Sequence, residues 1–167
     1  MNTLPNDGSN IAIVAINYLQ PMQLGGGGLK NDTPIVLGDL SSSSLQFNIT
    51  PYDVDPNVAG YYFIELCDKD SEGNTYVLSM KNSDGPGGSN LIIRKKPTSS
   101  FNRDAWSVTY DDSSGMWHIL NHNDNLYIVT QDRTGDGSSD AVTIAAAQTN
   151  NTGGWVIGEI FDGLPVI

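Results

Sequence analysis

A chain of 167 residues is long enough to form one well-packed core and short for two, so we predict a single domain spanning residues 1–167. Charged residues make up only 16% of the composition, and 18 Gly and 8 Pro supply many turn formers, which favours short strands over long helices. The formal net charge of −11 would repel a phosphate backbone or an anionic lipid surface, so neither nucleic acid nor membrane insertion is expected.

Apolar runs bounded by turn residues recur along the chain, and none carries the stripe of an amphipathic helix. In chain order they form three passes of four short strands: 11–17, 22–24, 33–37 and 45–49, then 61–66, 76–80, 90–94 and 105–108, then 116–121, 126–129, 141–144 and 154–157. The sequence therefore predicts an all-β protein of three imperfect four-stranded repeats, at about residues 9–58, 59–113 and 114–162.

Each pass ends on an aromatic residue with a β-branched residue two positions later, in the pairs Phe47/Ile49, Trp106/Val108 and Trp155/Ile157. Since alternate residues of a strand share a face, each pair points to one side, and three pairs can meet around a common axis. The gap from Phe47 to Trp106 exceeds that from Trp106 to Trp155, so the second pass must hold extra loop residues. We expect these residues at Ser83–Ser89 or Pro97–Arg103.

The first pass contains Ile16-Asn17, a Thr-Pro strand at Thr33–Leu37 and a closing Gln46-Phe47, while the later passes keep Trp106 and Trp155 without the preceding Gln. This layout resembles the β-trefoil, a fold with pseudo-threefold symmetry, and within it the ricin-B-type lectin repeat. It is also similar to mushroom trefoil lectins and to trefoil protease inhibitors. The resemblance implies a non-enzymatic binding protein whose partner is a glycan or glycoprotein or, alternatively, a protease.

A sugar-binding repeat of that family carries an Asp on its second strand, and the corresponding positions here fall near Gln23, Ser79 and Thr130, none of them acidic. Other acidic residues would have to substitute: Asp32, Asp39, Asp124 or Asp132. The densest polar and aromatic cluster follows Trp117, which alternation assigns to the core. We therefore predict carbohydrate binding, if it occurs, at a turn of four residues: His122, Asn123, Asp124 and Asn125.

The chain has one concentrated basic segment, at 94–103. Protease inhibition, the alternative function, would present Lys95, Lys96 or Arg103 from this loop to a protease. An exposed loop that balances the local charge explains the same residues.

The segment 132–140 places Asp132, Asp136 and Asp140 where their oxygens can wrap a hard cation, and it is similar to Asp-rich calcium loops. A hairpin turn explains its Asp-Gly step equally well. Apart from this calcium alternative we expect no cofactor, and because no nucleophile or acid/base set is recognisable, we expect no enzymatic activity.

Cys67 is the single cysteine and lies in a strand-like run, so we expect a small buried hydrophobe and no internal disulfide. The chain shows no signal peptide and no apolar run long enough to span a membrane. We expect a soluble protein, either cytoplasmic or secreted without a visible leader.

Overall fold

The computed structural model describes residues 3–15, 19–38, 45–81, 91–123, 127–131, 141–145, 154–161 and 164–166. Strands dominate this part of the chain, and its helices are two short 3-10 turns, η1 at Pro5–Gly8 and η2 at Asn102–Asp104. None of the helices in these ranges has the length and apolar character that crossing a membrane requires. The prediction of an all-β protein is confirmed.

Six strands form a closed ring, in which every neighbour is antiparallel. They are β1 (Ile11–Ala15), β4 (Phe47–Pro51), β5 (Tyr62–Lys69), β8 (Trp106–Asp111), β9 (Met116–Asn121) and β12 (Trp155–Phe161). Pairing runs from β1 to β4, β5, β8, β9 and β12, and β12 returns to β1. Closing the sheet into a barrel leaves no open edge in this ring.

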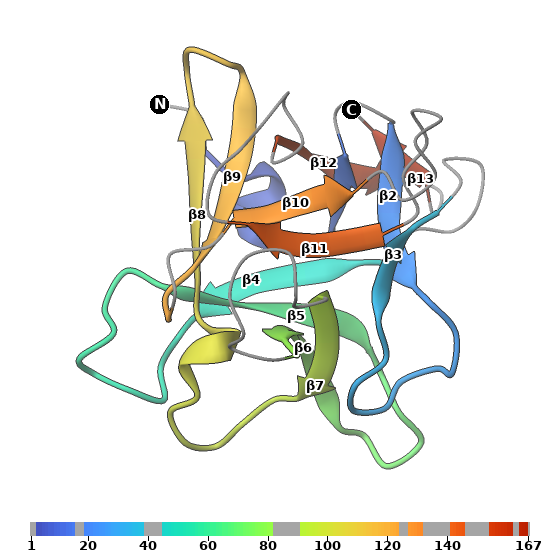
Figure 1. Cartoon of the computed structure of the whole chain (residues 1–167), viewed down its shortest axis with the longest axis vertical. Coiled ribbons are helices and arrows are strands. Elements are labelled where there is room, and N and C mark those ends of the chain that lie inside the picture. The colour runs from blue at the N-terminus through green and yellow to red at the C-terminus, as the bar shows by residue number, and fades with distance from the viewer. Residues whose placement is uncertain are drawn as a thin grey trace.

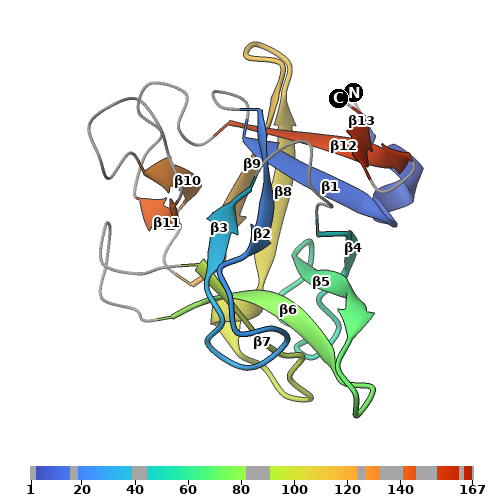
Figure 2. The ribbon, with the colours of Figure 1, turned by 90° about the vertical axis from the view of Figure 1, so that its right-hand side faces the viewer.

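Three hairpins accompany the barrel, one from each repeat: β2 (Gln20–Leu24) with β3 (Ile35–Leu37), β6 (Thr75–Met80) with β7 (Leu91–Lys95), and β10 (Tyr127–Gln131) with β11 (Ala141–Ala145). The first hairpin touches the other two through the pairs Pro34–Ile92 and Val36–Ala141. A last strand, β13 (Leu164–Val166), pairs with β12. A six-stranded barrel with three hairpins is the β-trefoil architecture (Figures 1 and 2).

The three aromatic residues that close the repeats occupy matching places in the barrel. Phe47, Trp106 and Trp155 are each 0% exposed and belong to one hydrophobic core. Each pairs with the first strand of its own repeat and with the first strand of the next, through the pairs Phe47–Ile11, Phe47–Leu66, Trp106–Tyr62, Trp106–Asn121, Trp155–Trp117 and Trp155–Ala15. The predicted threefold arrangement of these rings is confirmed.

The two indole rings also tie the barrel to the hairpins. Trp106 Nε1 donates to the carbonyl of Leu78 on β6, and Trp155 Nε1 donates to the carbonyl of Ile128 on β10, both at 3.0 Å. A phenyl ring has no such donor. In the first repeat the main-chain N–H of Leu45 reaches the corresponding carbonyl, that of Met22 on β2, at 3.4 Å.

The repeats differ in the lengths of their connections. The interval Met22–Leu37 equals Leu78–Ile93, so the β6–β7 hairpin, which contains Ser83–Ser89, is not longer than its counterpart. Three other connections are lengthened when residues at equivalent register positions are compared. Across β5–β6, the interval Leu66–Leu78 exceeds Ala15–Met22 and Asn121–Ile128. Across β7–β8, Ile93–Trp106 exceeds Leu37–Phe47 and Ile144–Trp155, and across β4–β5, Phe47–Tyr62 exceeds Trp106–Trp117. Of the two predicted positions of the extra residues, Pro97–Arg103 lies in a lengthened connection. Ser83–Ser89 lies outside the described residues, between strands whose interval is not lengthened.

Alternation decides which strand residues face the core. Trp117 and Ile119 are buried while His118 is partly exposed, as the sequence predicts. The expectation of a buried Cys67 is wrong, because Leu66 points inward and turns Cys67 to the outer face. There it is half-buried, with Sγ 3.5 Å from Asn10 Oδ1. Burial nevertheless raises the pKa of this thiol, which keeps it protonated and poorly reactive.

Candidate functional site

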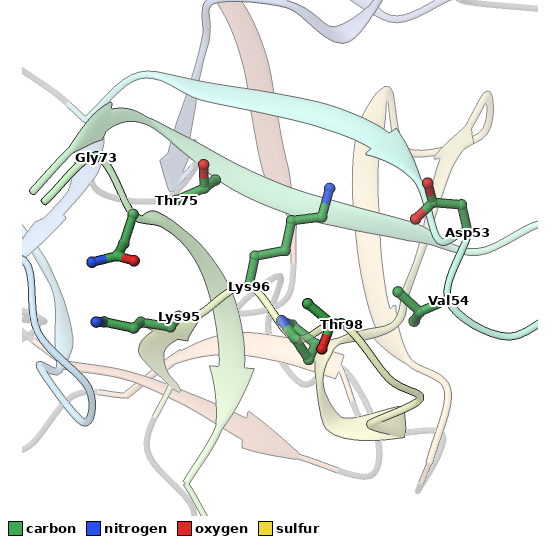
Figure 3. A pocket seen from close by; sticks show the side chains of 9 residues that line it. Asp53, Val54, Gly73, Thr75, Lys95, Lys96 and Thr98 are labelled. Carbon is green, nitrogen blue, oxygen red and sulfur yellow. The ribbon is translucent and has the colours of Figure 1, made fainter.

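The three lengthened connections meet at one pocket, with a volume of about 530 Å³. It is lined by residues 53–54 of the β4–β5 connection, by residues 73–75 of the β5–β6 turn and the start of β6, and by residues 95–98 at the end of β7 and after it (Figure 3). Figures 1 and 2 show all three connections at the lower end of the molecule, opposite the β8–β9 turn. A pocket of this size lies within the range of small-molecule sites.

The β5–β6 turn is held in shape by Asp70. Its carboxylate accepts hydrogen bonds from the main-chain N–H groups of Glu72 (3.0 Å) and Asn74 (2.9 Å) and from the Tyr76 hydroxyl (3.1 Å). The Asn74 side-chain amide donates to it as well, and these hydrogen bonds lower the pKa of Asp70 to about 2. Gly73 completes the turn with φ of +80°, a conformation that glycine adopts without strain.

Two lysines enter the pocket from the end of β7, and each is held by a carboxylate. Lys96 pairs with Glu65 of β5 and lies over the Phe63 ring, 4.7 Å from its centroid. Lys95 Nζ lies 3.6 Å from Glu72 Oε2 on the neighbouring turn. Figure 3 shows the two side chains diverging, Lys95 toward Gly73 and Lys96 toward the side of Asp53. Lys96 is therefore held by both its ion pair and the Phe63 ring, whereas Lys95 makes a surface ion pair.

The remaining groups of the pocket supply acceptors and an apolar surface. The Asp53 carboxylate is exposed and makes no hydrogen bond or ion pair with any residue that the structure describes. Thr75 and Thr98 bring hydroxyl groups, and Val54 and Pro97 bring partly buried apolar side chains. Donors, acceptors and an apolar surface side by side suit a ligand rich in both hydroxyl and C–H groups.

A second surface feature joins the end of the β4–β5 connection to the residue that follows β9. The rings of Tyr61 and His122 are in contact, with centroids 4.3 Å apart and planes inclined by 58°; we call them the aromatic pair. Nearby, Asp55 accepts hydrogen bonds from the Asn57 main chain (2.9 Å) and the Ser100 hydroxyl (3.1 Å). These bonds, with a smaller electrostatic contribution from His122, lower the pKa of Asp55.

The predicted carbohydrate residues are only partly within the described chain. His122 is half-buried in the aromatic pair, with its main-chain N–H on the Ala105 carbonyl at 2.9 Å, and Asn123 is exposed beside it. Asp124 and Asn125 lie outside the described residues, so their role stays a prediction. No sequence pattern links Tyr61 to His122, because their contact is long-range.

The position of the family's sugar-binding Asp is non-acidic in all three repeats. The carbonyls of Met22, Leu78 and Ile128 are equivalent, so the following residues, Gln23, Ser79 and Val129, occupy this position. The position predicted near Thr130 is therefore that of its neighbour Val129. Of the substitutes considered, Asp32 is exposed on the β2–β3 connection, and Asp39, Asp124 and Asp132 lie outside the described residues.

A buried carboxyl group lies next to Ser79, the second of these three positions. Asp104 of η2 is 1% exposed, and its Oδ1 has no hydrogen-bond partner within the described part of the chain. Burial raises its pKa to about 6, although the Ser79 hydroxyl and the positive charges of Arg94 and Arg103 counteract the rise. A carboxyl group so deeply buried cannot touch a ligand.

The residues predicted to inhibit proteases do not form one projecting loop. Lys95 is the last residue of β7, and Lys96 is paired with Glu65. Arg103 lies in η2, donates to the Lys81 carbonyl at 3.3 Å and rests against the Phe101 ring. Protease inhibition stays a prediction that none of these contacts favours.

The predicted calcium ligands Asp132, Asp136 and Asp140 lie outside the described residues, and calcium binding stays a prediction. Within the described ranges, no three His, Cys, Asp or Glu side chains come together as a metal site.

No protein-family model and no curated protein matches this sequence significantly. Solved structures do match. SeviL bound to asialo-GM1 saccharide is 13% identical, with a TM-score of 0.60 over 92% of this chain and 98% of its own. The Polyporus squamosus lectin bound to the epitope Neu5Aca2-6Galb1-4GlcNAc is 15% identical, with a TM-score of 0.63 over 91% and 49%.

The BEL beta-trefoil is 11% identical, with a TM-score of 0.64 over 93% of this chain and 95% of its own. Identities this low establish the architecture alone. Together with the closed barrel and the three matching aromatic residues, they show that the chain is a β-trefoil protein that resembles lectins of this fold.

Proposed function

We propose that this protein is a non-enzymatic carbohydrate-binding protein and that the pocket is its site. The observation that carries the proposal is the convergence of all three lengthened connections on one polar pocket. The barrel does not need the extra residues, since the other repeats close it with shorter connections. Loops that exceed what a scaffold requires are where binding residues concentrate.

The chemistry of the pocket fits a saccharide. Sugar hydroxyls both donate and accept hydrogen bonds, and the C–H face of a sugar ring packs against apolar groups. The ammonium groups of Lys95 and Lys96 supply donors, the Asp53 carboxylate supplies an acceptor, and Val54 supplies an apolar contact. Two of the similar structures, SeviL and the Polyporus squamosus lectin, are complexes with saccharides, which supports the same class of ligand here.

The carboxyl groups around the pocket do not support catalysis. A general acid at neutral pH needs a raised pKa, whereas the pKa of Asp70 is lowered to about 2 and Glu65 is paired with Lys96. Asp104, the carboxyl group with a raised pKa among the described residues, is too deeply buried to reach a substrate.

The test is binding of the purified protein to an array of defined glycans, followed by titration calorimetry with the best saccharide on the array. We expect Asp53→Ala to weaken binding about tenfold, because a sugar hydroxyl loses a charged acceptor. Asp112→Ala, which removes an equally exposed carboxylate from the distant β8–β9 turn, should leave the affinity unchanged. A silent array, or equal effects of the two variants, would contradict the proposal.

A further inference from the structure

The pocket and the aromatic pair pack against the same hydrophobic cluster. A small hydrophobic cluster, separate from the barrel core, consists of Tyr52, Val58, Phe63, Val77 and Ala105. Val54, which lines the pocket, and Tyr61, which belongs to the aromatic pair, both pack against this cluster. The Lys96 ammonium group lies over the ring of Phe63, a member of the same cluster. The two surface features are therefore fixed relative to each other by shared packing.

The surface between the pocket and the aromatic pair is short and polar. In the β4–β5 connection, Asp55 directly follows Val54 of the pocket. In the β7–β8 connection, Ser100 lies two residues after Thr98 of the pocket. Each connection therefore runs from the pocket to the Asp55–Ser100 hydrogen bond within two residues. Consecutive Cα atoms are about 3.8 Å apart, so this step is at most about 8 Å long. The β7–β8 connection is also held by a hydrogen bond from the Phe101 N–H to the Tyr52 hydroxyl at 2.8 Å.

The two features differ in what they offer a ligand. The pocket presents charged donors and an acceptor, whereas the aromatic pair presents two partly exposed rings, on which the C–H face of a sugar ring can lie. Carboxylates outnumber ammonium groups around the pocket: Lys95 and Lys96 face Glu65, Glu72, Asp53 and Asp70. Since the whole chain also carries a net charge of −11, an anionic ligand is repelled.

We propose that the pocket and the aromatic pair are two subsites of one extended site, which takes an uncharged oligosaccharide across the Asp55–Ser100 hydrogen bond. This inference rests on the proposed function and adds the length and the charge class of the ligand. One sugar residue occupies the pocket, and another lies against Tyr61 and His122. Linking the two contacts in one ligand makes the second contact intramolecular, which raises the affinity above that of a monosaccharide.

The test is calorimetric titration of the full chain with neutral saccharides of one to three residues, namely galactose, lactose and globotriose together with N-acetylglucosamine, chitobiose and chitotriose. In the series that binds, affinity should rise at least about tenfold from the monosaccharide to its longest member. Asp53→Ala and His122→Ala should each weaken binding of the longest member, and only one of the two should weaken binding of the monosaccharide. His122→Ala spares the fold, since its main-chain bond to Ala105 remains.

The outcomes separate the two proposals. If the monosaccharide and the longest member bind equally well, or if His122→Ala leaves the affinity for the longest member unchanged, the extended site is refuted while the pocket stands. If no saccharide of either series binds and the glycan array is silent as well, both proposals fail. Sialyllactose should bind more weakly than globotriose, a neutral trisaccharide of the same length, and tighter binding of the sialylated form would refute the assignment of an uncharged ligand.

Discussion

The barrel interior and the loops of the second repeat differ in how closely they follow the threefold pattern. Phe47, Trp106 and Trp155 occupy equivalent buried positions with equivalent strand partners. The connections that line the pocket, in contrast, span longer intervals between equivalent register positions than their counterparts do. A closed core tolerates little change in volume, while lengthening a surface loop costs little free energy. The comparison indicates that stability resides in the repeated part, whereas the proposed binding site lies in the part that departs from the repeat.

The largest effect is expected in the barrel. Trp106→Ala should lower the free energy of unfolding by about 3 to 5 kcal/mol, because it leaves a cavity and removes the indole donor from the Leu78 carbonyl. Trp155→Ala should cost a similar amount, since Ile128 provides the matching carbonyl. Urea denaturation measures both. A loss no greater than that of Thr109→Ala, an exposed position on the same strand, would break the assignment of Trp106 to the core.

The buried carboxyl group of Asp104 should make stability depend on pH. Its pKa of about 6 in the folded protein lies above the ordinary 3.8, so the folded state holds the proton more tightly than the unfolded state does. Stability is therefore greatest below pH 4 with respect to this group, and about 2 to 3 kcal/mol is lost as the pH rises to 7. Asp104→Asn should abolish this fall. Asp70 and Asp111 act in the opposite direction: their pKa values are lowered from 3.8 to about 2, so the stability they contribute is lost as the pH falls, mainly below pH 4.

Chemical denaturation at pH 4, 5, 6 and 7 tests this prediction. The wild type and Asp104→Asn should agree at pH 4 and separate by pH 7, with the variant the more stable. Parallel profiles would show that Asp104 is ionised in both states without penalty.

A smaller effect is expected at the turn beside the pocket. Gly73 has φ of +80°, and a Cβ at this position would meet no atom within 4 Å, so Gly73→Ala strains the backbone without a clash. The cost should be about 1 kcal/mol in unfolding free energy. Gly73→Asn should cost less, because Asn tolerates this conformation better. Equal losses for the two variants would indicate that the conformation of the backbone does not determine the effect.

The smallest change in stability is expected for Lys95→Ala. The Lys95 side chain is 46% exposed and its ion pair with Glu72 is on the surface, so stability should change by less than about 0.5 kcal/mol. Saccharide binding should nevertheless fall about tenfold, because the pocket loses a charged donor. Lys30→Ala, the same change on the exposed β2–β3 connection, should alter neither quantity. An unchanged affinity for Lys95→Ala would remove this lysine from the site.

The fold was predictable because its determinants repeat. A buried aromatic residue followed two positions later by a β-branched one is visible in each pass, and alternation alone places Trp117 in the core. The same alternation, applied to Leu66 and its neighbour Cys67, would have shown that the cysteine faces outward.

The pocket was not predictable in the same way. Its three segments come from connections that follow no period, and the Lys96–Glu65 ion pair joins residues 31 positions apart. Lys95 and Lys96 stood out in the sequence as basic residues in an acidic chain, but their carboxylate partners appear only when β5, β6 and β7 come together. Tyr61 and His122 meet for a similar reason, since the contact spans two repeats.

All three tryptophans of the chain belong to the barrel core, and none lines the pocket. Their intrinsic fluorescence should therefore be blue-shifted in the native protein and shift to the red on denaturation. A saccharide that fills the pocket should leave the emission spectrum almost unchanged, so this optical signal reports the integrity of the scaffold independently of occupancy.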